Sequence, residues 1–359
     1  MEYEMYISVG LHRAQHRRHG QRNLPMKQKQ WPRHKPASPP SIKKQKNSYA
    51  LAKSSKPPKF PQFNPSPDAS STSTSISAVP YDALVRIASS FTLPDLRAAS
   101  LVCRAWRDAL KPLSEAMALF RRGKQFKHGL GRVQPSLGKA LDCFLKAAAR
   151  GSILAMVDAG LIYWEMGKFE KAVVWYRRAA ELGDPAGQCN LAISFLQAKP
   201  PNTKEAVEWL YKASVAGHAR AQYQLALCFH QGKGVEQSVQ EAAGWYARAA
   251  EGGYARAMYN TSLCYSLGEG LVQSDMLARK WMRRAADHGH SKAQYEHGLA
   301  LISEGDAMNG VVYLELATRA GEMAAAPARD AVLEQLSATC RKRAVLLADK
   351  WRALASSSR

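Results

Sequence analysis

The stretch AQYQLALCFHQGKGVEQSVQEAAGWYARAAEGG, residues 221–253, decides the fold of this 359-residue chain. It holds two largely apolar segments, separated by a loop that carries Gly232 and Gly234, and the second segment ends at Gly253. A glycine directly after an apolar periodic segment is typical of a helix end. The stretch therefore predicts two helices joined by a turn.

The same pattern recurs when the chain is aligned on the glycine that ends each second segment. These glycines stand at intervals of 32 to 36 residues: Gly151, Gly183, Gly217, Gly253, Gly289 and Gly321. An alanine stands four residues before each glycine, and Trp or Tyr stands eight before it, except for a cysteine in the first unit. Small and aliphatic residues occupy the ninth and tenth positions after the first five glycines. A period of this length is typical of solenoids built from helix pairs.

Each of these columns has a physical interpretation. Glycine adopts the left-handed conformation that closes a helix at little cost. Small residues allow the two helices of a unit to approach closely, and the aromatic column fills the space between neighbouring units. One unit cannot bury its apolar stripe alone, so stacked units supply the core. We therefore expect an all-α solenoid.

The array resembles the Sel-like repeat family, relatives of the tetratricopeptide repeats with a longer, glycine-bearing loop. The resemblance covers residues 116–326 and is tightest at Ala221–Gln294, with Ala-Gln-Tyr-Gln-Leu-Ala at 221–226 and Gly-Lys-Gly-Val at 232–235. It implies six repeats over residues 114–326, the last of them degenerate.

The C-terminal segment, residues 327–359, follows Pro327 with a broad apolar stripe. We expect one capping helix over Asp330–Leu354 that closes the array. The basic run at residues 341–343 is expected to face water.

Upstream of the array, residues 79–110 have the sequence VPYDALVRIASSFTLPDLRAASLVCRAWRDAL. Two apolar stripes at helical spacing flank Thr92–Asp95, which has the residue types of a helix start. About thirty residues hold too little apolar surface to fold alone. This segment therefore requires a neighbour or a partner.

The same residues resemble the F-box. Pro80–Ile87 is similar to the opening of the family motif, and Asp95-Leu96 followed by Val102–Arg107 is similar to its second half. The departures from the motif are Val79, Ala83, Ala88 and Phe91. The resemblance implies a three-helix module over 79–113 that docks a Skp-family adaptor and, through it, a cullin–RING ubiquitin ligase. The residues that it implies for adaptor contact are Pro80, Leu84, Ile87, Leu96, Val102, Cys103 and Trp106.

A second interpretation of this segment stays open, namely a small helical cap at the start of the array. The segment Arg107–Glu115 joins it to the first repeat and contains Pro112 but no flexible glycine–serine run. We therefore expect a nearly fixed angle between the F-box-like module and the array.

Residues 1–78 differ from the rest in composition. They hold ten of the 18 prolines, and 14 Lys and Arg against three acidic residues, so +11 of the net charge of +22 lies there. Such a segment cannot bury enough apolar area to offset its chain entropy, so we expect a disordered basic tail. The cluster at residues 42–46 suits nuclear import or a nucleic-acid contact, and His12, His16 and His19 suit either a metal ion or a solvated tail. We expect the protein in the nucleus, the cytoplasm or both.

The sequence gives no sign of an enzyme. No nucleophile–base set or cluster of metal ligands recurs in it, and the loop glycines Gly232 and Gly234 follow no strand that would indicate a dinucleotide site. The six cysteines stand far apart without a C-x-x-C pair, which favours a reducing compartment. There is no apolar run of eighteen residues and no signal-peptide core. We expect a non-catalytic protein with no cofactor, no metal and no membrane partner.

Protein binding is the expected activity, because solenoids bind partners along an extended face. Candidate residues of such a face lie six and seven positions after three of the repeat glycines: Tyr223, Gln224, Tyr259, Asn260, Tyr295 and Glu296. An aromatic ring beside a polar group offers stacking area and hydrogen bonds, although the same pair can serve only to lock neighbouring units together.

We expect the substrate-receptor subunit of a Skp/cullin/F-box type ubiquitin ligase, with the array binding a protein substrate. One alternative is a protein-interaction scaffold without ubiquitin transfer. The other is a nuclear protein whose tail binds nucleic acid, and the sequence favours it least.

Overall fold

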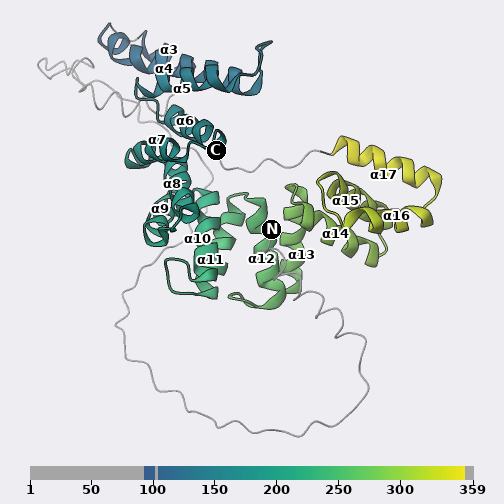
Figure 1. The fold of residues 1–359 in the computed structure, drawn as a ribbon. Coiled ribbons are helices and arrows are strands. Elements are labelled where there is room, and N and C mark those ends of the chain that lie inside the picture. Colours follow the sequence, from purple (N-terminus) through teal and green to yellow (C-terminus); the bar gives the residue numbers. More distant parts are fainter. Residues whose placement is uncertain (1–92, 102–103, 352–359) are drawn as a thin grey trace, which may run out of the picture. The chain divides into compact units, whose positions relative to one another are not determined.

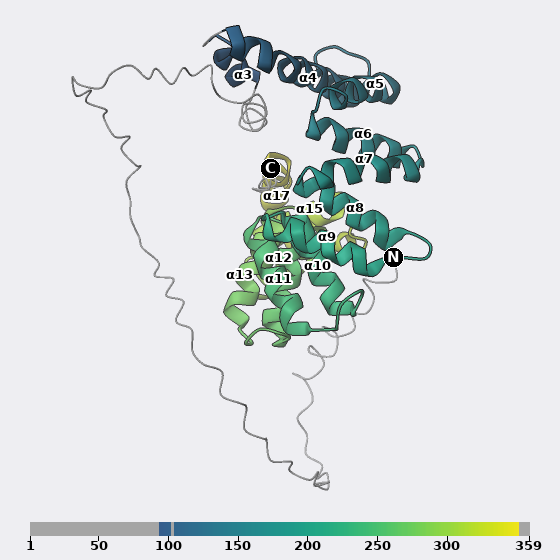
Figure 2. The same ribbon diagram turned by 90° about the vertical axis from the view of Figure 1, so that its left-hand side faces the viewer.

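Helices follow one another along the array, and each packs on the next (Figures 1 and 2). The computed structural model describes residues 93–101 and 104–351, which belong to one unit, Thr72–Arg359. The expected tail and the first half of the F-box-like segment lie outside the described residues. Within the described ranges the elements are helices without strands, so the predicted all-α solenoid is confirmed. None of the helices in this part of the chain is both long and apolar enough to cross a bilayer.

Six helix pairs form the array, and each pair contacts the next. Their bounds are α4 Arg104–His128 with α5 Leu137–Ala148, α6 Ile153–Glu165 with α7 Phe169–Glu181, α8 Pro185–Gln197 with α9 Thr203–Val215, α10 Ala219–Gln231 with α11 Val239–Glu251, α12 Ala255–Leu267 with α13 Asp275–Asp287, and α14 Ser291–Ser303 with α15 Ala307–Arg319. In each pair we call the earlier helix the first helix and the later one the second helix.

The turn between units shows why glycine and alanine hold fixed places in the repeat. All six repeat glycines have φ between 82° and 88°. The residue after each glycine donates its N–H to the carbonyl of the alanine four residues before that glycine, as from Tyr254 to Ala249 at 3.1 Å. This bond closes the helix end, and all six alanines are 0% exposed. The predicted roles of both columns are confirmed.

The paired loop glycines have a packing role that the sequence did not reveal. Gly234 lies against the backbone carbonyl of Thr203 at the start of α9, and Gly270 against that of Val239 at the start of α11. A Cβ atom at either position would overlap that carbonyl. The loop of each of these units therefore rests on the second helix of the unit before it, which fixes the spacing between units.

Helix α4 is continuous across the join between the F-box-like module and the array. It has 25 residues and contains Pro112. On its first half, Leu110 packs with Leu96 of α3 (Leu93–Ala99), in a cluster that reaches Met117. From Leu119 onward, the side chains of α4 belong to the first repeat core. The absence of a flexible stretch in the sequence thus corresponds to one unbroken helix.

The expected single capping helix is wrong. Two helices, α16 Ala325–Gln335 and α17 Ala338–Lys350, are separated by Leu336 and Ser337. Leu336 has extended backbone angles of φ −89° and ψ 148°, and the Ser337 hydroxyl accepts a hydrogen bond from the N–H of Cys340. Serine at this position starts a new helix. Both helices pack on α15 as a result.

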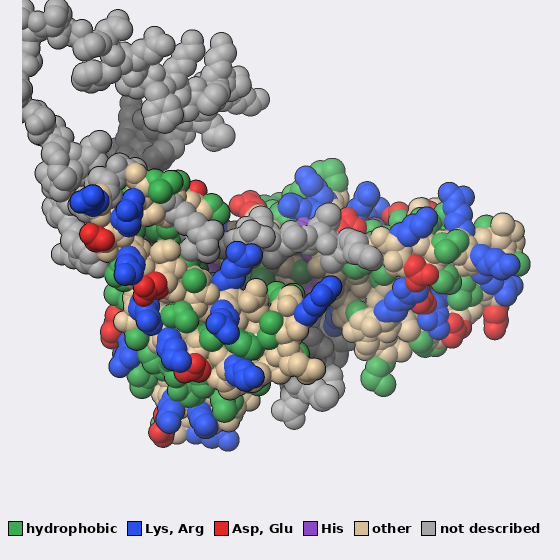
Figure 3. All heavy atoms as spheres, turned by 90° about the horizontal axis from the view of Figure 1, so that it is seen from above, with side chains coloured by type: hydrophobic (Ala, Val, Ile, Leu, Met, Phe, Trp, Pro, Cys, Tyr) green, Lys and Arg blue, Asp and Glu red, His purple; other side chains and the backbone are tan. Residues whose placement is uncertain are grey.

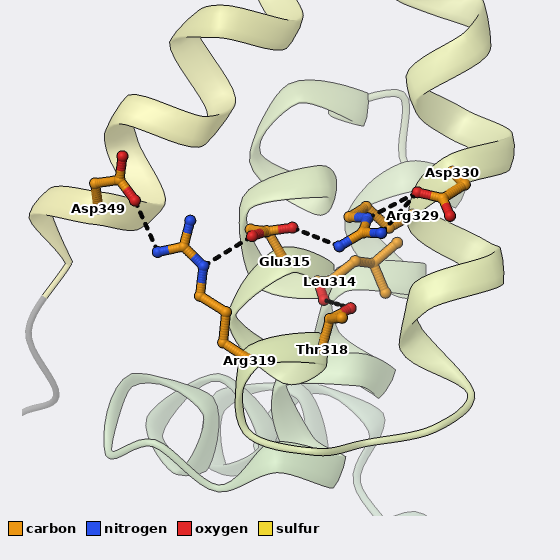
Figure 4. Close-up of polar contacts among 7 residues, drawn as sticks. All are labelled: Leu314, Glu315, Thr318, Arg319, Arg329, Asp330 and Asp349. Carbon is orange, nitrogen blue, oxygen red and sulfur yellow. Dashed lines mark hydrogen bonds and ion pairs between the residues drawn. The ribbon is translucent and has the colours of Figure 1, made fainter.

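Ion pairs also join these two helices to α15 (Figure 4). Glu315 accepts hydrogen bonds from Arg319 and from Arg329 of α16, each at 2.7 Å, and Arg319 pairs with Asp349 of α17 at 2.8 Å. Burial alone raises the pKa of Glu315, but the hydrogen bonds from the two arginines lower it overall. Residues 341–343 face solvent, as expected. An apolar cluster adds to the contact between α15 and α17: Val311, Val312, Leu316, Ala344 and Ala348.

Candidate protein-interaction sites

The F-box-like module is described from α3 onward. Leu96 is 1% exposed and packs with Ala99 and Leu110. Trp106 is half-buried at the edge of this cluster. Leu101, in the turn after α3, is 76% exposed. In the described part of the module, Leu101 and part of the Trp106 ring therefore form apolar surface that is accessible to a partner.

The seven residues predicted for adaptor contact fall into three groups. Pro80, Leu84, Ile87, Val102 and Cys103 lie outside the described residues. Trp106 keeps part of its ring exposed, so its contact role stays a prediction. Leu96 is a correction, because its side chain fills the core of the module and leaves no surface for a partner. The exposed Leu101 was not predicted, since it lies outside the apolar stripe that marks the helix.

Tyr259 joins two units of the array. Its hydroxyl donates to Glu296 of α14 at 2.8 Å, and its ring stacks on His290 with centroids 4.7 Å apart. The ring is only 5% exposed. Burial raises the pKa of the Glu296 carboxyl. Tyr259 and Glu296 therefore lock neighbouring units together, which is the second of the two roles that the sequence left open for these residues.

The other four predicted residues of the array lie half-buried on the first helices: Tyr223, Gln224, Asn260 and Tyr295. The Tyr223 ring contacts those of Tyr246 and Tyr254, at 5.7 Å and 5.0 Å between centroids. The Asn260 side chain hydrogen-bonds Tyr246. All four keep part of their surface in contact with solvent, and their role in binding stays a prediction.

The thiols of the array are protected by burial. Cys143, Cys189 and Cys228 are free and buried. Burial raises the pKa of Cys189 to about 12 and that of Cys228 to about 11, so both stay protonated at neutral pH and are poor nucleophiles. Over residues 93–101 and 104–351, no three His, Cys, Asp or Glu side chains gather where they could hold a metal ion.

Comparison with known proteins assigns both parts of the chain to families. The Sel1 repeat model matches residues 116–152, 167–184, 185–218, 219–254 and 255–290, and the F-box-like model matches residues 76–113. The helix pair α14–α15 lies beyond the matched repeats. The chain is 61% identical over 282 residues to the F-box protein At1g70590 of Arabidopsis thaliana, and the alignment covers 77% of this chain and 80% of that one.

Two solved structures have a similar fold. One is c5321, a protective antigen of uropathogenic Escherichia coli, with a TM-score of 0.54 and 22% identity over 76% of this chain and 63% of that chain. The other is a Sel1 repeat protein from Oxalobacter formigenes, with a TM-score of 0.54 and 25% identity over 64% of this chain and 98% of that chain.

Fold and repeats together define a helical solenoid of the Sel1 repeat class. The two matched families indicate a role in protein interaction. The chain belongs to the F-box proteins that carry Sel1 repeats.

Proposed function

We propose that the chain is the substrate-receptor subunit of a Skp/cullin/F-box type ubiquitin ligase. The F-box-like module docks a Skp-family adaptor, the adaptor joins the cullin complex, and the repeat array holds the protein substrate. The continuity of α4 is the observation that carries the proposal. Because the module core reaches Met117 and the repeat core begins at Leu119 on one helix, the array is held in a constant orientation to the module.

In this role the chain performs no chemistry of its own. It holds a substrate while the enzymes of the complex transfer ubiquitin. This division of labour agrees with the two matched families, neither of which is a catalytic family. We place the receptor in the nucleus, the cytoplasm or both, in keeping with the basic cluster at residues 42–46.

The test is co-purification of a Skp-family adaptor with the full chain. A double variant, Pro80→Ala with Leu84→Ala, should lose the adaptor, because it removes apolar surface at the motif positions that the F-box family uses for docking. The matched control is Val345→Ala with Leu346→Ala, which removes exposed apolar surface from α17 and should leave the pull-down unchanged. Circular dichroism should show unchanged helical content in both. Full adaptor recovery with the first variant would overturn the proposal.

One observation favours a second candidate, a scaffold without ubiquitin transfer. Leu96 and Leu110 are each 1% exposed, so the described part of the module closes a core of its own without any partner. A wild-type chain that captures other proteins but no Skp-family adaptor would establish this second function instead.

A further inference from the structure

Three successive first helices of the array contain no acidic residue. In the view of Figure 3, Lys and Arg side chains are spread among fewer Asp and Glu side chains. The first helices α8, α10 and α12 have 13 residues each, and none of these is Asp or Glu. The second helices beside them, α9, α11 and α13, each carry both signs of charge. We call the surface of α8, α10 and α12 the acid-free face.

Cations recur at one position of the repeat on this side of the array. Arg220, Arg256 and Lys292 each stand three residues after a repeat glycine, in the first turn of α10, α12 and α14. Arg220 donates to the side-chain oxygen of Asn190 of α8 at 3.4 Å, and Lys292 lies 5.8 Å from the Tyr259 ring centroid. Within the described residues, none of the three cations has a carboxylate within ion-pair distance. Three successive units, those that begin with α10, α12 and α14, thus contribute one cation each that lacks a carboxylate partner.

Two half-buried histidines, His218 and His290, lie close enough to these cations for the charges to lower their pKa. Burial, and then Arg220, lower the pKa of His218, although Asp184 opposes them. Burial, and then Arg256 and Lys292, lower the pKa of His290 to about 4. Both rings therefore stay neutral at pH 7. The two histidines therefore add no positive charge to that of Arg220, Arg256 and Lys292.

Amide side chains follow the cations about one helical turn further on. Asn190, Gln224 and Asn260 each stand seven residues after a repeat glycine, and all three are half-buried. An amide side chain both donates and accepts hydrogen bonds, so it matches the alternating N–H and C=O groups of an extended polypeptide. Asn190 already accepts one hydrogen bond from Arg220 and Asn260 bonds Tyr246, whereas the Gln224 side chain makes no hydrogen bond in the part of the chain that the structure describes.

The acid-free face is bounded at each end by a helix that carries acidic residues. On α6, Asp158 and Glu165 are neutralised by Lys124 at 2.8 Å and Lys127 at 3.0 Å, both from α4. On α14, the place of the amide is taken by Glu296, which is occupied by the Tyr259 hydroxyl. The acid-free face therefore ends at the first turn of α14.

We propose that the acid-free face binds an extended peptide segment rich in Asp and Glu. The peptide lies across α8, α10 and α12 and ends at Lys292, with its carboxylates on the cations and its backbone on the amides. The first helices α10, α12 and α14 each present one such cation, and an extended chain advances about 3.3 Å per residue, so acidic residues set at regular intervals along the peptide meet successive cations. The inference rests on the proposed function, because it names the class of substrate that the receptor holds.

A nucleic acid fits this face less well. One cation per unit gives three phosphate contacts in all, fewer than the roughly 6–10 that give nucleic-acid binding its strength. Glu296 beside Lys292 would repel a continuous phosphate backbone, whereas a peptide ends its acidic run there.

The test uses the full chain and a short fluorescent peptide with Glu at every third position, followed by fluorescence anisotropy at low salt. The face variant is Arg220→Glu with Arg256→Glu. The matched control is Lys204→Glu with Lys280→Glu, exposed cations of α9 and α13, which changes the net charge by the same amount. We expect the face variant to raise the Kd by about fivefold for each of the two ion pairs that it removes, since an exposed pair contributes up to about 1 kcal/mol, and the control to leave the Kd unchanged.

Further arms separate the sources of negative charge. A peptide with Gln in place of Glu should not bind, and peptides with phosphoserine in place of Glu, or a single-stranded RNA of similar length, should bind no more tightly than the Glu peptide. Equal weakening by the face and control variants would overturn the proposal, as would binding restricted to phosphoserine or tighter binding of RNA. Adaptor co-purification is measured on the same variants. Its retention while peptide binding is lost separates this proposal from the proposed function.

Discussion

His290 combines two structural roles in one side chain. Its Nδ1 accepts a hydrogen bond from the N–H of Ala293 at 3.2 Å and so caps α14, while its ring stacks on Tyr259. A protonated imidazole has no acceptor, so the cap exists only while the ring is neutral. Burial, assisted by the cations Arg256 and Lys292, lowers the pKa of His290 to about 4 and keeps it neutral.

This lowered pKa predicts that acid weakens the array. His290 has an ordinary pKa of 6.5 in the unfolded chain and about 4 in the folded one, so below pH 6.5 the unfolded state takes up the proton first. The stability that the neutral ring contributes is fully present above about pH 6.5 and is lost as the pH falls toward 4, by about 3 kcal/mol in total. Urea unfolding across this range measures it.

The variant that tests this effect is His290→Asn, because asparagine caps a helix without titrating. Its free energy of unfolding should depend less on pH than that of the wild type. The matched control is His230→Asn, at a histidine that caps no helix, and it should keep the wild-type slope. Parallel pH profiles for His290→Asn and the wild type would contradict the assignment.

At the scale of the element, the C-terminal helices depend on one carboxylate. The Glu315 side chain is 16% exposed and pairs with both Arg319 and Arg329, whereas the Asp349 side chain, which pairs with Arg319, is 52% exposed. Truncating Glu315 removes a part-buried ion pair from each of two arginines, while truncating Asp349 removes an exposed pair from Arg319. The two carboxylates therefore differ in energetic weight.

We predict that Glu315→Ala lowers the free energy of unfolding by about 1–3 kcal/mol and that Asp349→Ala lowers it by less than about 1 kcal/mol. Hydrogen exchange should accelerate in α16 and α17 with the first variant and much less with the second. Asp330→Ala, at the exposed partner of Arg329, serves as a further control. Equal effects of all three variants would show that the apolar contacts alone hold these helices.

Local signals made most of these elements predictable. The glycine and alanine columns report helix ends through their own backbone chemistry, so the helix pairs follow from sequence. The break at Leu336 and Ser337 does not, because the apolar stripe continues through it and one serine cap redirects the chain. Gly234 was identified as a loop residue only, since the carbonyl that requires a glycine there belongs to the preceding unit.

At the scale of the whole molecule, α4 transmits position from the F-box-like module to the array. Two insertions after Ala118, between the two cores, test this role. One carries about seven glycine and serine residues, and the other about seven helix-forming residues, roughly two turns that restore the helical phase. In a reconstituted ligase, the flexible insertion should spread self-ubiquitination over more lysines of the array than the helical insertion does, as mapped by mass spectrometry.

Both insertions should retain the adaptor, because the cluster around Leu96 and Leu110 lies before the insertion. Identical modification patterns for the flexible and the helical insertion would show that the continuity of α4 has no part in presenting a substrate.

The binding surface was only partly predictable at this scale. The sequence places Tyr223, Tyr259 and Tyr295 in one column, but burial divides the column, because Tyr259 is sealed against the next unit. The acid-free face appears only when whole helices lie side by side, since no single repeat shows that acidic residues are missing. In the F-box-like module, the apolar stripe shows that Leu96 lies on an apolar helix face. It does not show whether that side chain packs in the core of the module or contacts a partner.

The shared helix also affects how genetic experiments on this chain should be interpreted. A deletion that follows the family boundary and removes residues 76–113 cuts α4 partway along its length, so the helix that carries the first repeat core loses the turns before that core. A cell that carries such an allele therefore loses the F-box-like module and also the continuous helix that joins it to the array. Point substitutions are therefore the cleaner route to a receptor that still captures its target but cannot deliver it.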